Sequence, residues 1–150
     1  MIFSNRFKGR TAIITGGASG LGKAVAARIC SEGGSVVLWD LNATLLEAAA
    51  LETGAKGVVA VDVSNAEDVA QAATTSMALL GKIDILINAA GITGATQPVW
   101  EFPIDSWLRV MDINLNGLFY CCRSVVPHML ANNYGRVVNI ASVAGKEGNP

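Results

Sequence analysis

Short apolar stretches alternate along the chain with longer stretches of helical periodicity. The short stretches are continuous and rich in β-branched residues, as expected of strands that helices cover on both faces of a parallel sheet. This pattern predicts strands over Thr11–Thr15, Ser35–Asp40, Gly57–Val63, Ile83–Asn88 and Gly135–Ser142.

Helices are expected between the strands, where apolar residues recur every three or four positions. They cover about residues 21–32, 42–52, 66–80 and 104–130. A capping box from Ser64 to Glu67 begins the third helix, and Pro127 either kinks the fourth or lies near its end. A loop is expected over 89–103. Since right-handed crossovers join parallel strands, the predicted fold is α/β, a doubly wound parallel sheet in one domain of residues 1–150.

Composition and charge narrow the classes of partner and site. Apolar residues make up 51% of the chain, charged residues 15%, and the net charge is -1. Neither a nucleic acid nor a membrane is therefore an expected partner, and no signal peptide is expected. The cysteines Cys30, Cys121 and Cys122 form no disulfide framework, which predicts free thiols in a cytoplasmic protein. No metal site is expected, and His128 is expected to have a surface or packing role.

A glycine-rich segment, TGGASGLGKA, joins the first strand to the first helix. Its glycines Gly16, Gly20 and Gly22 follow the spacing T-G-x-x-x-G-x-G. Such a turn brings backbone N–H groups at a helix N-terminus close to a pyrophosphate, and Gly20 and Gly22 carry no side chain to block that approach. A Walker-type loop is disfavoured because Ala24 follows Lys23. Glycine is also needed in tight turns that bind no ligand, so the spacing alone leaves both interpretations open.

Asp40 ends the second predicted strand, 18 positions after Gly22. An acidic residue at this point binds the ribose hydroxyls of an adenosine and repels a ribose 2′-phosphate. No basic residue flanks Asp40, and Ser19 rather than a basic residue precedes Gly20. These residues predict NAD as the cofactor in preference to NADP. The alternative is that Asp40 caps the following helix.

Together with this turn, four further segments resemble the short-chain dehydrogenase/reductase (SDR) family along nearly the whole chain. The pair Asp62-Val63 resembles the family's adenine contact, and NAAG resembles its N-N-A-G element, with Ala89 replacing the second Asn. MDINLNG and GRVVNIASVAG resemble the elements that carry the catalytic Asn and Ser. The resemblance implies a Rossmann fold whose cofactor contacts are Gly16, Ser19, Gly20, Leu21, Gly22, Asp40, Asp62, Val63, Asn88, Ala89 and Gly91.

The same resemblance implies hydride transfer between NAD(H) and a secondary alcohol or ketone. The small-molecule substrate would be a sugar, a sugar acid or a 3-oxoacyl thioester. Ser142 would orient the substrate oxygen, and Asn114 would hold a water molecule in a proton relay. Each residue has a structural alternative, since Ser142 could close a local turn and Asn114 could satisfy backbone groups at a helix irregularity. Asn114 would do both jobs in this family.

Two apolar features near the substrate end have open interpretations. Trp100, Phe102 and Trp107 follow the fourth predicted strand and either line a substrate mouth or anchor the loop to the core or an interface. The long helix carries a wide apolar stripe, which is explained as a core-facing surface or, by the resemblance, as part of a homotetramer interface.

The family's catalytic Tyr-x-x-x-Lys motif does not occur in these residues. Neither Tyr120 nor Tyr134 has a lysine four positions later, and Lys146 lies in a predicted loop. The chain is therefore expected to be a Rossmann domain that is incomplete at its C-terminus, truncated after the fifth strand and inactive by itself. The alternatives are a natural truncation and a non-catalytic NAD-binding module. A sugar-nucleotide epimerase is disfavoured, because such proteins usually show T-G-x-x-G-x-x-G.

Overall fold

The computed structural model describes residues 3–147, and the remaining residues of the predicted domain, 1–2 and 148–150, lie outside this range. Five parallel strands form one sheet in the order β3-β2-β1-β4-β5. The strands are β1 (Thr11–Thr15), β2 (Ser35–Asp40), β3 (Gly57–Ala60), β4 (Ile85–Asn88) and β5 (Arg136–Asn139). The predicted doubly wound α/β fold is confirmed.

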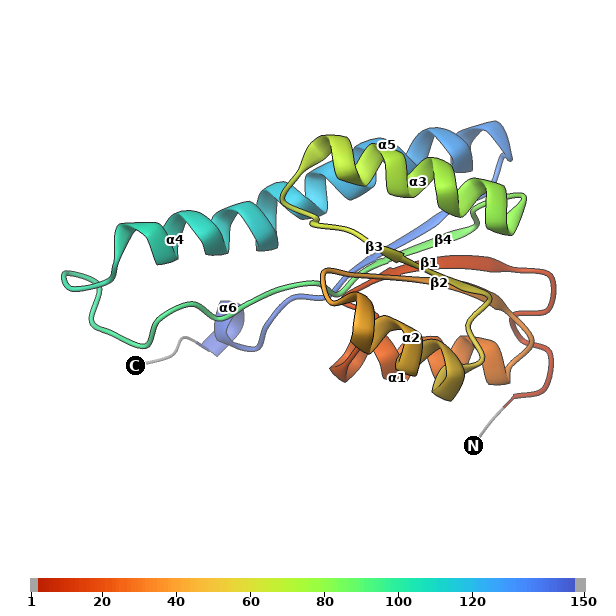
Figure 1. Cartoon of the computed structure of the whole chain (residues 1–150), viewed down its shortest axis with the longest axis horizontal. Coiled ribbons are helices and arrows are strands. Elements are labelled where there is room, and N and C mark those ends of the chain that lie inside the picture. The colour runs from red at the N-terminus through yellow and green to blue at the C-terminus, as the bar shows by residue number, and fades with distance from the viewer. Residues whose placement is uncertain (1–2, 148–150) are drawn as a thin grey trace.

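Helices cover both faces of the sheet (Figure 1). One face carries α1 (Gly20–Ser31) and α2 (Ala43–Thr53), and the other carries α3 (Ala66–Leu80) and α5 (Gly117–Ala131). Successive residues of β1 point to opposite faces, so Ile14 packs with Leu46 and Ala26 of α2 and α1, whereas Ile13 packs with residues of α3 and α5. The strands β1, β2 and β4 are buried on both faces, which explains their continuous apolar sequences.

The predicted fourth helix is interrupted. Its parts are α4 (Ile104–Met111), the π-helical segment η1 (Asp112–Asn116) and α5, and Pro127 lies inside α5. Together they make one long rod in which α4 projects beyond the carboxyl ends of the strands (Figure 1). Such π-helical insertions are frequent at functional sites, and this one contains Asn114.

Several predicted boundaries were wrong. The strands β3 and β5 end three residues earlier than expected, because the chain turns at Asp62–Ser64 and again at Ser142–Gly145. β4 begins at Ile85 rather than Ile83. Asn65, and not Ser64, caps α3, since its Oδ1 accepts the N–H groups of Glu67 and Asp68. A short helix, α6 (Ala144–Glu147), occupies part of the segment expected to be a loop.

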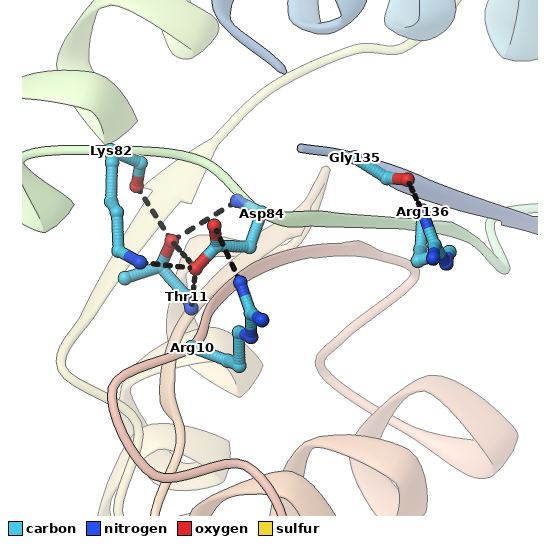
Figure 2. A network of polar contacts seen from close by, with 6 residues as sticks. All are labelled: Arg10, Thr11, Lys82, Asp84, Gly135 and Arg136. Atoms are coloured by element: carbon cyan, nitrogen blue, oxygen red, sulfur yellow. Dashed lines mark hydrogen bonds and ion pairs between the residues drawn. The ribbon is translucent and has the colours of Figure 1, made fainter. Parts of the chain in front are cut away.

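Asp84 centres a polar network at the amino-terminal ends of β1 and β4 (Figure 2). Its carboxylate is 1% exposed and accepts hydrogen bonds from the Thr11 backbone N–H at 3.0 Å and from Lys82 Nζ at 2.9 Å. The Arg10 guanidinium lies 3.5 Å away. Burial alone would raise the pKa of Asp84, but the bonds from Lys82 and Thr11 and the charges of Lys82 and Arg10 lower it overall. The network joins β1 to β4 at their amino-terminal ends, which lie opposite the carboxyl ends of the strands.

The substitution Asp84→Asn is expected to lower the free energy of unfolding by about 2 kcal/mol at neutral pH, because Lys82 and Arg10 lose the opposite charge of the buried Asp84 carboxylate. The pKa of Asp84 is lower in the folded state than the unfolded value of about 3.9. Its contribution is therefore fully present above that value and is lost as the pH falls through the folded-state pKa. Denaturant unfolding of both proteins across the acidic range measures this. Equal acid sensitivity of the variant and the wild type would contradict the prediction, and Asp105→Asn, at an exposed position, is the control.

Candidate active site

An open cleft of about 910 Å³ lies at the carboxyl ends of the strands. The strand order reverses between β1 and β4, and open α/β sheets bind ligands outside such a switch point. The lining comes from the ends of β1, β4 and β5, from the segments that follow β1, β3, β4 and β5, and from the junction of α4 with α5. It consists of Thr15, Leu21, Val63, Asn88, Ala89, Ala90, Gly91, Ile92, Thr93, Ile113, Asn114, Gly117, Leu118, Cys121, Asn139, Ile140, Ala141 and Ser142.

Glycine occupies the three positions of the first turn for different structural reasons. A Cβ on Gly22 would lie 2.2 Å from the carbonyl oxygen of Gly16, and a Cβ on Gly16 would lie 2.8 Å from that of Ala89. Gly16 and Gly22 are therefore required by the close packing of the protein's own backbone. Gly20 has a φ of +52° and faces open space. The expectation that Gly22 leaves room for the ligand is corrected, because the atom it makes room for belongs to Gly16.

The start of α1 is suited to an anion. Ser19 precedes the helix in an extended conformation, and its side chain makes no capping hydrogen bond to the first turn. No acidic residue occupies that turn, so the positive end of the helix dipole is not offset there. Leu21 is 66% exposed beside it and lines the cleft.

Asp40 lies at the end of β2 and stabilises the glycine-rich turn. One carboxylate oxygen accepts the Ala18 N–H at 3.2 Å, and the other accepts the Asn42 N–H at 3.1 Å. The N-cap of α2 is Asn42, whose Oδ1 accepts the Leu45 N–H at 3.0 Å. The alternative that Asp40 caps α2 is therefore wrong, and its carboxylate remains at the carboxyl end of β2 next to the turn.

Asp62 and Val63 follow β3 on the same edge of the sheet. The Oδ1 of Asp62 accepts hydrogen bonds from the hydroxyl and N–H of Ser64, at 2.6 and 2.9 Å. These two bonds lower the pKa of Asp62 most, and the charge of Arg109 lowers it further against the opposing effect of burial. Val63 is buried, and its Cγ2 lies 3.0 Å from where a Cβ on Gly117 would be. These contacts favour the charged form of the Asp62 carboxyl, next to the buried apolar side chain of Val63.

Hydrogen bonds join the ends of β1, β4 and β5 beneath the cleft. Thr15 Oγ1 accepts the N–H groups of Ala89 and Ala90, both at 3.0 Å. Asn88 is 5% exposed and donates from Nδ2 to Asn139 Oδ1 at 2.9 Å. Thr15 was not predicted as a site residue, although its place before Gly16 in the T-G-x-x-x-G-x-G pattern was the available signal.

Asn114 lies in η1 and points at the loop after β4. Its Oδ1 accepts the Ile92 N–H at 2.9 Å, and its Nδ2 donates to the Ile92 carbonyl at 2.8 Å. The side chain thus satisfies backbone groups at a helix irregularity, as one interpretation of the sequence expected. A Cβ on Gly91 would lie 3.3 Å from Asn114 Oδ1, so Gly91 allows this close approach.

Ser142 is exposed and lines the cleft. Its Oγ accepts the Ala144 N–H at 3.1 Å, and its carbonyl oxygen accepts the Gly145 N–H at 3.1 Å. The expected local turn is therefore present. As an acceptor in that turn, the hydroxyl keeps its proton available for donation to another group.

The aromatic residues after β4 do not line the cleft. Trp100 is 79% exposed and donates from Nε1 to the Glu101 carboxylate, and Trp107 is 55% exposed on α4. The Phe102 ring lies 3.3 Å from where a Cβ on Gly94 would be. Anchoring of the loop by Phe102 is therefore the interpretation that the geometry favours over a substrate mouth.

Three further expectations concern the cysteines, a metal site and a membrane-spanning helix. All three cysteines are free, and burial raises the pKa of the Cys121 thiol to about 12, with a further contribution from Cys122. Within residues 3–147, no group of His, Cys, Asp and Glu side chains has the arrangement of a metal site. In the same range, no helix has the length and apolar character needed to cross a bilayer.

A profile of the short chain dehydrogenase family matches residues 10–150. The chain belongs to this family. Among its curated relatives, the 2-dehydro-3-deoxy-L-rhamnonate dehydrogenase (NAD(+)) of Sphingomonas sp. is 68% identical over 149 residues, which are 99% of this chain and 60% of the relative. A 3beta-hydroxysteroid dehydrogenase of Mediterraneibacter gnavus is 40% identical over 97% of this chain and 54% of its own length.

Solved structures of short-chain dehydrogenases share the fold. The crystal structure of NAD+-bound xylitol dehydrogenase superimposes with a TM-score of 0.92 at 38% identity, over 97% of this chain and 57% of that one. Levodione reductase gives a TM-score of 0.90 at 39% identity, over 96% of this chain and 58% of that one. The chain therefore spans somewhat more than half the length of the short-chain dehydrogenases it matches.

Proposed function

We propose that the whole protein is an NAD-dependent dehydrogenase that transfers a hydride between NAD(H) and a secondary alcohol or ketone. The observation that carries this proposal is the cleft at the switch point, where Thr15 and Leu21 of the glycine-rich segment lie with Asn114 and Ser142. The relative with 68% identity is an NAD(+) dehydrogenase by name. A non-catalytic NAD-binding module is disfavoured, since both of the curated relatives described above carry enzyme names.

The residues at the start of α1 and the end of β2 fit a dinucleotide. Gly20 faces open space, and the uncapped first turn of α1 would receive the pyrophosphate. The carboxylate of Asp40 would accept the ribose hydroxyls, and Asp62 with Val63 would bound the adenine. When bound, the nicotinamide supplies the hydride acceptor or donor. Leu21, Asn88, Ala89 and Gly91 would bound the inner part of the cofactor site.

At the substrate end, Ser142 would donate its hydroxyl proton to the substrate oxygen and fix that oxygen's direction. Asn114 holds the Ile92 peptide beside the cleft and would hold a water molecule for proton transfer. A tyrosine with a lysine four positions later, the acid–base pair that the family resemblance implies, does not occur in residues 1–150. Proton transfer by such an acid–base pair is proposed for the whole protein, and Ser142 would orient the substrate.

We propose a sugar acid as the substrate class. The support is the 68% identity to a dehydrogenase of a deoxy sugar acid, together with hydroxyl and amide groups of Thr93, Asn114 and Ser142 in the cleft. Such groups can bind several substrate hydroxyls by hydrogen bonds. A screen of the intact protein with NAD and a panel of sugar acids, neutral polyols and hydroxysteroids tests this. NADH formation confined to a neutral class would refute the sugar-acid assignment.

The preference for NAD is expected to depend on Asp40. Removing its charge with Asp40→Asn relieves repulsion of a ribose 2′-phosphate, which is expected to tighten NADP binding about 10-fold. Asparagine keeps one acceptor for the Ala18 N–H, so NAD binding should weaken less than about 10-fold, the cost of one hydrogen bond. Calorimetric titration with both dinucleotides measures the change. An unchanged ratio of the two dissociation constants would contradict the role of Asp40, and Glu47→Gln on the exposed side of α2 is the control.

The proposed assembly is a cytoplasmic homotetramer. Free cysteines suit a reducing compartment. Along α4 and the following turns, Ile104, Trp107, Leu108, Leu115 and Phe119 are each more than half exposed. An apolar stripe of this size on a soluble chain is typical of a protein interface. Light scattering of the intact protein tests the stoichiometry, and a monomer at micromolar concentration would refute it.

A further inference from the structure

Asn88 and Asn139 form a cross-strand pair at the carboxyl ends of β4 and β5. They are partners in the strand register, and both line the cleft. Asn88 Nδ2 donates to Asn139 Oδ1 at 2.9 Å, and the Asn88 carbonyl accepts the Ile140 N–H at 2.9 Å. One side-chain bond and one backbone bond therefore join the two strands where β5 ends.

The two members of this pair are held very differently. Asn88 is 5% exposed, pairs with Thr15 in the register of β1, and approaches Cys122 Sγ of α5 at 3.5 Å. β5 is at an edge of the described sheet, and all four of its residues are exposed. Asn88 is thus the fixed member, and the bond to Asn139 transmits that fixed position to the end of β5.

Ser142 lies three residues after Asn139, in the turn that begins where this pairing stops. Within residues 3–147, its hydrogen bonds are local, to Ala144 and Gly145. The turn can fix the direction of the Ser142 hydroxyl relative to its own backbone, but the position of the whole turn depends on the end of β5. That end is fixed by the two bonds to Asn88.

We propose that Asn139 is a positioning residue for Ser142, acting through its hydrogen bond with Asn88. The inference rests on the proposed function, in which Ser142 orients the substrate oxygen. A displacement of a reacting group by about 1 Å can cost about 100-fold in rate. Losing the acceptor would also leave Asn88 Nδ2 as a buried donor whose remaining contact is the long one to Cys122. The pair thus couples a buried amide to the placement of an exposed hydroxyl.

The test compares two substitutions of nearly the same shape in the intact protein. Asn139→Leu removes the acceptor, and Asn139→Asp keeps an oxygen at that point. The leucine variant is expected to lower kcat by about 10- to 100-fold, with the NAD dissociation constant changed by less than about two-fold because Asn139 is not itself one of the proposed cofactor contacts. The aspartate variant is expected to recover most of kcat. Val138→Thr, one position earlier on β5, is the matched control.

A double-substitution cycle separates positioning from a general structural role. If Asn139 acts through Ser142, then Asn139→Leu should cost little further rate in a protein that already carries Ser142→Ala. An unchanged kcat in Asn139→Leu alone would overturn the inference. So would a full rate loss in the Ser142→Ala background, or a parallel loss of NAD affinity and thermal stability without rescue by aspartate. Absence of any turnover by the wild-type protein would instead refute the proposed function itself.

Discussion

The substitution Gly22→Ala is expected to weaken NAD binding by the intact protein by about 100-fold or more. The added Cβ would lie 2.2 Å from the Gly16 carbonyl oxygen and 2.8 Å from its carbon, so the start of α1 and the turn must separate. Both contacts are with backbone, which has no rotamer to relieve the clash. Overpacking of this kind costs about 1–3 kcal/mol of stability. The same shift moves the N–H groups that would bind the pyrophosphate, so affinity should fall by about 100-fold or more.

Calorimetric titration with NAD and thermal unfolding measure the two effects of Gly22→Ala separately. Gly54→Ala is the matched control, because Gly54 ends α2 with a φ of +73° and its Cβ would meet no atom within 4 Å. That variant should lose stability through backbone strain while NAD affinity stays constant. An NAD dissociation constant for Gly22→Ala within about two-fold of wild type would contradict the assignment of this turn to the cofactor, since about 100-fold is expected.

Ser142→Ala is expected to lower kcat by about 100- to 1,000-fold while NAD affinity remains unchanged. Loss of one preorganised donor to a reacting oxygen typically has this effect. The turn should survive, because the Ser142 carbonyl still accepts the Gly145 N–H and the side chain is exposed. The drop should therefore appear without a fall in thermal stability.

The control for Ser142→Ala is Ser142→Thr, which keeps the hydroxyl and is expected to retain more of the rate. Single-turnover measurements separate the chemical step from product release. A kcat for the alanine variant close to that of the wild type would show that the hydroxyl does not contact the substrate oxygen. The local turn would then be the whole role of Ser142.

The strands in the middle of the sheet could be predicted well from the sequence, because burial on both faces makes their pattern unambiguous. β1 and β2 have the expected bounds. The ends of β3 and β5 could not be predicted, since apolar residues continue past them into Val63 and Ile140. There the side-chain bonds of Asp62 and the end of pairing with Asn88 decide where the strand stops.

Contacts between segments that are distant in the chain could not be predicted from the sequence. Asp84 and Glu32 are charged residues, which are expected at the surface, yet they are only 1% and 0% exposed. Arginine, lysine and backbone donors surround both carboxylates, and several of these donors come from other segments of the chain. The π-helical segment was foreseen only as a helix irregularity at Asn114. The two hydrogen bonds between the Asn114 side chain in this segment and the Ile92 backbone join residues 22 positions apart.

The candidate site was predicted as a set of residues rather than as a geometry. Asn88 and Ser142 were expected at or just past the carboxyl ends of their strands, and both line the cleft there. Thr15 and Asn139 were not predicted as site residues. Both are polar residues at strand ends whose function lies in bonds to a neighbouring strand, and such pairing depends on a strand order that the sequence does not state.

The most direct test of the proposed dehydrogenase function measures how much NADH and how much keto product the intact, purified protein forms from a sugar acid. We predict that one NADH forms for each keto product, that NADP supports much less turnover, and that Ser142→Ala removes nearly all of it. Tight NAD binding without NADH formation from any secondary alcohol in the panel would contradict the account, and would establish the cleft as a binding site for the dinucleotide alone.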